Sequence, residues 1–291
     1  MNHQTFDNRV TASIEQMRPA EQRVVRFFLE NPEETLIESA LSLAEKVGTS
    51  DATVIRAVKS LGFSGMEEMR RSLADEMRRN PSPFNRLERT LDDVGDDLIS
   101  ALDITIDIHL KALKRLRRDI TPESFENTVQ YIVAAKRIYV FGIGPSSAMA
   151  NYFSIQLKRF GIEAISVTQT GILLADQLLH LKHGDLMMIF AYGRIYPELT
   201  TILDHSAKCG VLTVLFSDTL GTKLRDKVDI VLSVQRGRSD MLSMHTTTLG
   251  LIEALLVGVA KSQPEKALSS LKSLNELRTK LVGKRMDLPA S

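Results

Sequence analysis

Two different patterns of apolar residues divide the chain. Up to residue 79 the apolar positions recur at helical spacing, as in the segment with Val24, Val25 and Phe28, which predicts helices throughout. From Thr121 onward, short apolar runs alternate with amphipathic segments; the runs are RIYVF, AISV, LMMIFA, VLTVLF and DIVLSV. Such runs are typical of parallel strands, because both faces of these strands are covered. The pattern predicts an α-helical N-terminal domain joined to an α/β domain with a doubly wound, mainly parallel five-stranded sheet.

Proline and leucine positions suggest where these domains begin and end. The stretch RRNPSPFN, with Pro81 and Pro83, predicts a linker because proline cannot continue a helix. A long amphipathic pattern, DDLISALDITIDIHLKALKRLRRDI, follows and predicts a bridging helix. We therefore expect a helical domain over residues 1–79, a linker and bridging helix over 80–120, a sheet domain over 121–265 and a C-terminal helix over 266–291. That last helix has leucines at helical spacing, typical of core or oligomer contacts.

Composition narrows the class of protein only a little. A chain of 291 residues with 43% hydrophobic and 25% charged residues fits two soluble globular domains, and a net charge of +1 selects no partner. The single cysteine, Cys209, excludes an intramolecular disulfide, and no histidines are spaced as metal ligands, so neither metal nor cofactor is expected. The sequence shows no signal-peptide pattern and no long uncharged apolar stretch. We expect a cytoplasmic protein without membrane contact.

The segment ALSLAEKVGTSDATVIRAVKSLGF predicts a helix-turn-helix motif over about residues 39–60. Gly48 permits the turn and Ser50 can cap the second helix, whose first residues are small and polar enough to approach base edges. Thr53, Arg56 and Lys59 are expected to be exposed for bases and phosphates. An ordinary helical hairpin is the alternative. Residues 1–80 hold eleven Lys/Arg and thirteen Asp/Glu, a net charge of −2, so any DNA-binding surface must be local.

The same motif carries a family resemblance. Ser50, Thr53, Val54 and Arg56 form S-x-x-T-V-x-R, and LGFSG follows. This pattern resembles the signature of RpiR-type bacterial transcription regulators, and the resemblance covers nearly all of residues 10–75. Ala57 departs from it, because the family usually has an aromatic residue there. The resemblance implies double-stranded operator DNA as a partner, with Ser50, Thr53, Arg56 and Lys59 at the contact.

The segment VFGIGPSSAMA predicts a strand, a glycine-rich turn and the start of a helix. Glycines let the backbone approach an anion, and Ser146 and Ser147 add hydroxyl donors beside the helix N-terminus. A structural turn or a nucleotide site would show a similar pattern. The opening of a sugar isomerase (SIS) domain is resembled by the set Gly142, Gly144, Ser146, Ala150, Leu157 and Gly161, and the resemblance covers about residues 125–262. RpiR-type regulators carry this domain as their effector module.

A second loop, FAYGRIYPEL, follows the third predicted strand. In SIS domains this loop usually reads S-x-S-G-x-T-x-E and wraps a sugar phosphate. The resemblance aligns Phe190 and Tyr192 with the two serines, Ile195 with the threonine and Pro197 with the acid. A changed ligand, a lost phosphate site and a loop that only packs all remain open. The candidate effector residues are Gly144, Ser146, Ser147, Tyr192, Arg194 and His245.

Two functions are compatible with these motifs. The first is a DNA-binding transcriptional regulator whose SIS domain binds a phosphorylated or acidic sugar-derived effector. Because a helix-turn-helix usually reads two half-sites as a dimer, this function predicts a homodimer or homotetramer. The alternative is a sugar-phosphate aldose–ketose isomerase. Pro197 stands at the acid position, with Glu198 shifted by one residue, so no catalytic residue is predicted and we expect the chain not to be an enzyme.

Overall fold

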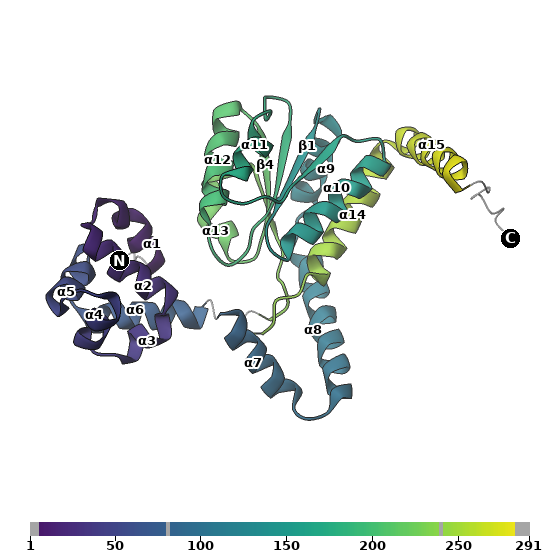
Figure 1. Ribbon diagram of the computed structural model, residues 1–291. Coiled ribbons are helices and arrows are strands. Elements are labelled where there is room, and N and C mark those ends of the chain that lie inside the picture. The colour runs from purple at the N-terminus through teal and green to yellow at the C-terminus, as the bar shows by residue number, and fades with distance from the viewer. Residues whose placement is uncertain (1–5, 80–81, 239–240, 283–291) are drawn as a thin grey trace. The chain divides into compact units, whose positions relative to one another are not determined.

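The computed structural model describes residues 6–79, 82–238 and 241–282 (Figure 1). Pro81, part of the expected linker, lies outside the described residues. The chain divides into two compact units between Arg89 and Thr90. In the part of the chain that the structure describes, we find no helix with both the length and the apolar character needed to cross a bilayer.

The first unit is helical, as its apolar pattern predicts. Its elements are α1 (Phe6–Ser13), the short 3₁₀ helix η1 (Ile14–Gln16), α2 (Pro19–Glu30), α3 (Pro32–Ile37), α4 (Ala40–Val47), α5 (Asp51–Ser60) and α6 (Met66–Arg79). Pro19 and Pro32 each occupy the first turn of a helix, where a missing N–H costs nothing. Phe28, Leu43 and Val54 are fully buried where α2, α4 and α5 meet.

Two helices follow this core directly along the chain, before the first strand. Pro83 begins α7 (Pro83–Val94), and the Ser82 hydroxyl accepts a hydrogen bond from the Asn85 N–H at its first turn. The expected bridging helix is α8 (Leu98–Asp119), where Asp97 caps the N-terminus by accepting from the Ile99 N–H. The proline-rich segment therefore contains the start of a helix, because Pro83 stands at a position that tolerates proline.

The second unit is built on a five-stranded sheet with the order β2-β1-β3-β4-β5. The strands are β1 (Ile138–Gly142), β2 (Ala164–Val167), β3 (Leu186–Phe190), β4 (Leu212–Ser217) and β5 (Ile230–Ser233), and every pair is parallel. The chain order reverses between β1 and β3, and open α/β sheets bind ligands beyond the carboxyl ends of the strands at such a point. Gly142 pairs with Phe190 there, so the loops after both strands begin side by side.

Helices cover both faces of the sheet, which confirms the predicted doubly wound arrangement (Figure 1). One face packs against α9 (Pro122–Ala134), α10 (Ser146–Arg159) and α14 (Thr246–Ser262). The other face packs against α11 (Leu173–Leu178), α12 (Pro197–Cys209) and α13 (Leu220–Leu224), which runs into the 3₁₀ helix η2 (Arg225–Lys227). The last helix, α15 (Pro264–Val282), leaves Leu268, Leu277 and Leu281 exposed.

Candidate functional site

Helix α5 is the second helix of the expected helix-turn-helix, and its start is fixed by local hydrogen bonds. Gly48 closes α4 with a φ of 70°, a left-handed conformation that favours glycine. The Ser50 hydroxyl accepts from the Thr53 N–H at 3.3 Å and lies 2.9 Å from the Thr53 hydroxyl. Ser50 is therefore the N-cap of α5, as predicted, and its side chain satisfies a backbone donor that the helix cannot satisfy itself.

Thr53 is buried, with 7% of its surface exposed, so the expectation that it is exposed is wrong. The cause is its place in the first turn, where its hydroxyl contacts Ser50 and accepts a hydrogen bond from Arg56 Nη2 at 2.8 Å. Arg56 and Lys59 are exposed, as expected. Arg56 is therefore an exposed side chain whose guanidinium is hydrogen-bonded to its own helix.

A carboxylate from another helix also contacts Arg56. Glu21, in the first turn of α2, is buried, and its Oε1 lies 3.9 Å from Arg56 Nε. Ser60, at the end of α5, donates to Glu21 Oε2 at 3.3 Å. The sequence gives no sign of this pairing, because Glu21 and Arg56 lie far apart in the chain and come together only when α2 packs on α5.

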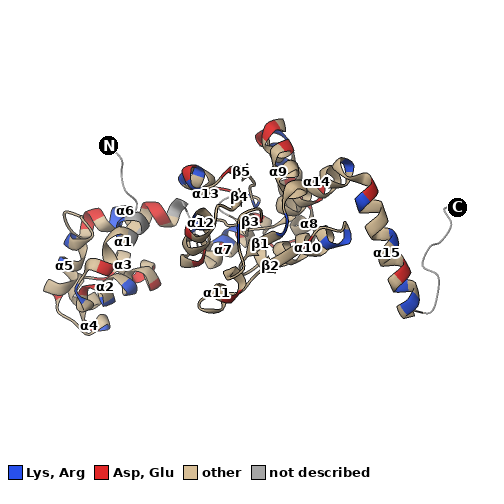
Figure 2. Cartoon of the chain, turned by 90° about the horizontal axis from the view of Figure 1, so that it is seen from above, with Lys and Arg blue, Asp and Glu red and all other residues tan. Residues whose placement is uncertain are grey.

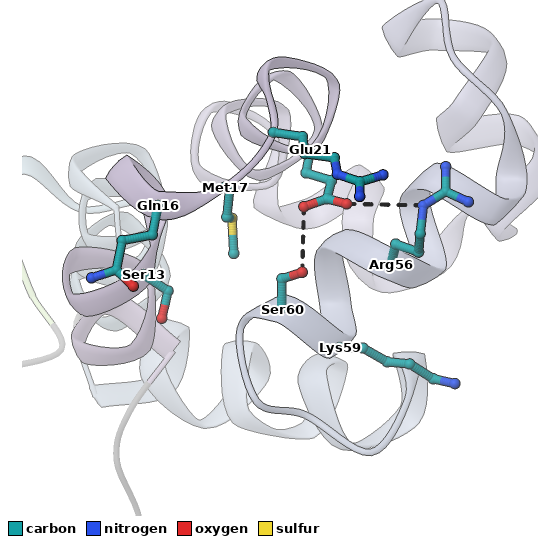
Figure 3. A pocket seen from close by; sticks show the side chains of 8 residues that line it. Ser13, Gln16, Met17, Glu21, Arg56, Lys59 and Ser60 are labelled. Carbon is teal, nitrogen blue, oxygen red and sulfur yellow. Dashed lines mark hydrogen bonds and ion pairs between the residues drawn. The ribbon is translucent and has the colours of Figure 1, made fainter.

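An open pocket of about 580 Å³ lies beside this ion pair (Figure 3). Its basic lining residues are Arg18, Arg56 and Lys59, and Glu21 is the acidic one. The other lining residues are Ser13, Gln16, Met17 and Ser60. Acidic and basic residues are interspersed along the helices of the first unit (Figure 2). The pocket therefore gathers positive charge and hydroxyl groups on a unit whose net charge is negative, an arrangement suited to an anionic partner.

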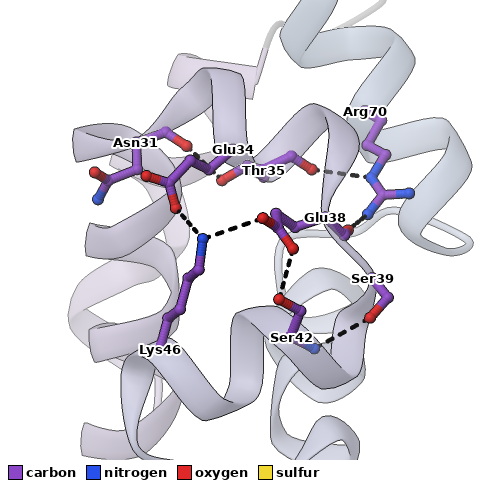
Figure 4. A network of polar contacts seen from close by, with 8 residues as sticks. All are labelled: Asn31, Glu34, Thr35, Glu38, Ser39, Ser42, Lys46 and Arg70. Carbon is purple, nitrogen blue, oxygen red and sulfur yellow. Dashed lines mark hydrogen bonds and ion pairs between the residues drawn. The ribbon is translucent and has the colours of Figure 1, made fainter.

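The helix that precedes the turn is anchored by a polar network (Figure 4). Lys46 of α4 bridges two carboxylates, with Nζ 2.6 Å from Glu34 Oε2 and 3.1 Å from Glu38 Oε1. The Ser42 hydroxyl donates to Glu38 at 2.5 Å. Hydrogen bonds from Ser42 and from Lys46 lower the pKa of Glu38.

Arg70 of α6 completes the network. Its guanidinium donates to the carbonyl oxygens of Thr35, at 2.9 Å, and of Glu38. These carbonyls lie at the end of α3, where a helix leaves its last oxygens without internal partners. The network therefore ties α3, α4 and α6 together and fixes the support on which α5 packs.

In the second unit, the first expected loop is a tight turn between β1 and α10. A Cβ atom on Gly142 would lie 2.5 Å from the carbonyl oxygen of Ser146, so only glycine fits this close approach. Gly144 has a φ of 54°, and the Ser147 hydroxyl donates to its carbonyl oxygen at 2.7 Å. Ser146 is buried at the start of α10. Gly144, Ser146 and Ser147 thus lie together at the carboxyl edge of the sheet.

Tyr192, in the second loop, is buried, and both its hydroxyl and its ring contact neighbouring side chains. Its hydroxyl is 2.9 Å from Thr248 Oγ1 on α14, and the Arg236 guanidinium lies over its ring, 4.3 Å from the ring centre. The His245 ring meets it edge-on with 5.7 Å between centres. Burial raises the pKa of the Tyr192 hydroxyl well above its usual range. Tyr192 therefore organises the loop as a neutral phenol.

His245 precedes α14 and is neutral at physiological pH. Burial, and then the charge of Arg236, lower its pKa to about 4. Its Nδ1 is 3.3 Å from Thr248 Oγ1, and its Nε2 is buried without a hydrogen-bond partner among the described residues. A buried ring nitrogen without a partner is a position from which an imidazole can bind a ligand hydroxyl or acid.

Asp218 and Arg236 join this cluster from the ends of β4 and β5. Arg236 Nη2 lies 3.6 Å from Asp218 Oδ2, and the other Asp218 oxygen accepts from the Gly193 N–H at 3.2 Å. The Nε of Arg236 is buried and finds no partner in the described part of the chain. Neither residue stands out in the sequence, although each follows an apolar strand, the position at which ligand contacts gather in such sheets.

Arg194 follows Tyr192 by two residues in the second loop. It is exposed on the turn after β3, and its N–H donates to the Tyr192 carbonyl at 2.8 Å. Glu198, next to the proline at the usual acid position, accepts from the Gly171 N–H at 3.2 Å. Arg236, Asp218, Tyr192, His245 and Thr248 together offer a cation paired with a carboxylate, a neutral imidazole and hydroxyls; we refer to them as the edge cluster. Such groups suit a polar ligand with an acidic substituent.

Comparison with known protein families supports both halves of this architecture. Residues 5–80 match the helix-turn-helix domain of the rpiR family, and residues 131–258 match the SIS domain. The bifunctional protein glk of Burkholderia orbicola is 29% identical over 85% of this chain, and the chain spans only 39% of the length of that protein. The HTH-type transcriptional regulator HexR of Pseudomonas aeruginosa is 23% identical, with 86% of this chain and 87% of that protein covered.

Solved structures show the same fold. The sugar isomerase domain of an RpiR transcription factor from Sphaerobacter thermophilus aligns with a TM-score of 0.54 and 26% identity over 58% of this chain and 94% of that one. The NanR protein of Vibrio vulnificus, solved with ManNAc-6P, aligns over 95% of this chain and 99% of that one, with a TM-score of 0.57 and 20% identity.

The chain thus joins a helix-turn-helix domain that matches the rpiR family, over residues 5–80, to a SIS domain, over residues 131–258, on a parallel five-stranded sheet. This order of domains is the one expected of the RpiR-type regulators that the sequence resembles.

Proposed function

We propose that this chain regulates transcription by binding duplex operator DNA through α5 and an acidic or phosphorylated sugar derivative through its SIS domain. The observation that carries the proposal is the pair of exposed cations, Arg56 and Lys59, on the second helix of an rpiR-family helix-turn-helix. A helix of this kind enters the major groove with its N-terminal residues toward the bases. DNA as the partner implies a cytoplasmic site of action.

Each proposed DNA residue has a role that its position suggests. Arg56 and Lys59 are the exposed cations of α5 and can reach bases or phosphates. Ser50 is exposed at the helix start and can approach the DNA backbone while it caps α5. Thr53 is buried, so we propose that it acts by holding Arg56 through its hydroxyl. A helix-turn-helix that reads two half-sites implies a homodimer or homotetramer.

The proposed effector site is the edge cluster together with Gly144, Ser146 and Ser147. Arg236 and the unpartnered His245 Nε2 suit an acidic group, and the fold is one on which the Vibrio vulnificus NanR protein binds ManNAc-6P. Arg194 is exposed at the rim of the same loop and can add a second cation. The small hydroxyls that usually surround a phosphate here are replaced by Phe190, Tyr192 and Ile195, which favours an acidic sugar over a simple sugar phosphate.

We do not propose an enzymatic role. An aldose–ketose isomerase needs a positioned base beside the substrate. Pro197 occupies the usual acid position, and Glu198 is engaged with the Gly171 N–H. Assays of purified protein on common pentose and hexose phosphates should therefore show no turnover, and measurable turnover would favour the isomerase.

The test of DNA binding uses the full chain. Duplexes are selected from a random library, and the affinity of the best duplex is measured by fluorescence anisotropy at several salt concentrations. Arg56→Ala and Lys59→Ala should each weaken binding by about 1–3 kcal/mol if the residue reads a base, or reduce the salt slope by about one if it contacts phosphate. Lys208→Ala, an exposed lysine on α12, is the matched control. Unchanged affinity in both α5 variants would overturn the proposal.

A further inference from the structure

Arg18 lies beside the pocket next to α5, and the local sequence fixes its place. It stands in the run Met17-Arg18-Pro19, between η1 and α2. Pro19 restricts the residue before it to extended backbone, and Arg18 has a φ of −64° and a ψ of 149°. Met17 is buried, and its carbonyl oxygen accepts from Gln22 Nε2 at 3.1 Å. The backbone on both sides of Arg18 is therefore anchored, while its side chain is exposed.

Arg18 and Lys59 reach the same pocket from different segments of the chain. They meet there because α2 packs against α5, which brings the turn before α2 next to the second half of α5. Three lining residues are basic and one, Glu21, is acidic, so the pocket carries a net charge of +2. Glu21 is already paired with Arg56 and Ser60 (Figure 3). Among the described residues, Arg18 and Lys59 thus have no acidic partner in the pocket.

We propose that this pocket holds one backbone phosphate of the DNA duplex, bound by Arg18 and Lys59. The major groove is about 12 Å wide and an α-helix with its side chains is about 10–12 Å across, so a helix in the groove fills it from wall to wall. The segments that flank this helix then meet the phosphates of the groove walls. The turn with Arg18 flanks α5 in this way. The proposal rests on the proposed binding of DNA through α5 and adds a contact from outside the helix-turn-helix motif.

The same geometry gives the two cations of α5 different tasks. Arg56 is nearer the start of the helix, and both Thr53 and Glu21 hold its guanidinium, which suits the two-point recognition of a base edge. Lys59 lies almost one turn nearer the end, and its ammonium is a point charge on a flexible stem, which suits a phosphate. Phosphate contacts fix register and orientation and carry no sequence information. Arg18 and Lys59 should therefore place α5 on the duplex, and Arg56 should read the sequence.

Anisotropy titrations of the full chain with its selected duplex, at several salt concentrations, test the assignment. Arg18→Ala removes one phosphate contact, so the ratio of wild-type to variant affinity should fall about 3.5-fold between 50 mM and 200 mM salt. Arg18→Lys keeps the charge and should keep the wild-type salt dependence. Arg26→Ala, which removes the same charge from an exposed position of α2 outside the pocket, is the matched control. The Arg18 side chain caps no helix, so Arg18→Ala should unfold as wild type does.

Substitution within the DNA locates the phosphate. A neutral methylphosphonate is placed at one backbone position of the duplex at a time. At one position it should weaken binding of the wild-type chain more than binding of Arg18→Ala, because the variant has already lost a contact to that phosphate. Arg26→Ala should lose as much affinity at that position as wild type does.

The proposal is overturned if Arg18→Ala keeps the wild-type salt dependence, or if no position of the duplex shows this coupling. Arg56→Ala, measured in the same titrations, separates such a failure from failure of the proposed function. It should weaken binding even if Arg18→Ala does not, and the pocket assignment would then fail alone. A chain that binds no duplex would overturn both.

Discussion

The buried carboxylate of Glu21 lies 3.9 Å from the exposed guanidinium of Arg56, although the two residues belong to different helices. Arg56 also donates to Thr53 on its own helix. The side chain that we propose to read DNA is thus held from two directions. A held side chain loses less freedom when it binds and can discriminate better between partners.

Replacement of Glu21 by Gln should reduce discrimination between DNA sequences. The amide keeps the size of the side chain and can still bind Ser60, but it removes the negative charge that holds Arg56. We expect affinity for a scrambled duplex to rise and the ratio of specific to non-specific affinity to fall by about 1 kcal/mol or less, the range of partly exposed ion pairs. Anisotropy with selected and scrambled duplexes measures both. Glu45→Gln on α4 is the control, and an unchanged ratio would show that Glu21 serves packing alone.

Ser50 should have two separable roles, capping α5 and approaching DNA. Ser50→Ala should lower the free energy of unfolding by about 1 kcal/mol, because the Thr53 N–H loses its acceptor. Ser50→Asp should restore stability, since aspartate is also a good cap, yet it should weaken operator binding by adding a negative charge at the interface. Urea unfolding and anisotropy give the two readouts. If Ser50→Asp binds DNA as well as wild type does, Ser50 lies outside the contact.

Acid should destabilise the sheet domain through His245. The pKa of this histidine is lowered to about 4 in the folded chain and is about 6.5 when unfolded, so the unfolded chain binds more protons between these values. The contribution of His245 is therefore fully present above pH 6.5 and is lost as the pH falls toward 4. Partial exposure limits it to about 1–2 kcal/mol. His245→Gln, which does not titrate, should lose less stability than wild type between pH 7 and pH 4.5 in urea unfolding; equal losses would contradict the shift.

Arg236 should contribute more to effector binding than Arg194. We expect a panel of sugar acids, sugar phosphates and cyclitols in a thermal-shift screen to give its largest stabilisation with an acidic sugar, about 2.7 kcal/mol at a hundred times Kd. Calorimetry with that compound should show that Arg236→Met abolishes binding and that Ser146→Ala and Arg194→Met weaken it. Tight binding of an ordinary hexose or pentose phosphate that none of these changes affects would show that the ligand lies elsewhere.

The fold could be predicted from the apolar pattern, because strands such as LMMIF are buried on both faces and the helices repeat at their own spacing. The start of α5 could also be predicted from the sequence, because Gly48 and Ser50 determine it through the backbone turn and a hydrogen bond within a few residues. The sequence could not show that Thr53 is buried, because the helix start turns its hydroxyl toward Ser50 and Arg56. Nor could it show Glu21 beside Arg56 or Arg236 over Tyr192. These contacts join segments that only the packed helices and sheet bring together.

The net negative charge of the helix-turn-helix domain has a consequence for how such a regulator would find its site. Affinity for arbitrary DNA comes almost entirely from cations that displace counterions from phosphates. With acidic residues in excess over residues 1–80, we expect that affinity to be small away from the groove that α5 fits. The protein would slide little along the chromosome and would search mainly by free diffusion. Few copies would be sequestered by non-cognate DNA, so occupancy of the operator would follow the number of molecules in the cell almost directly.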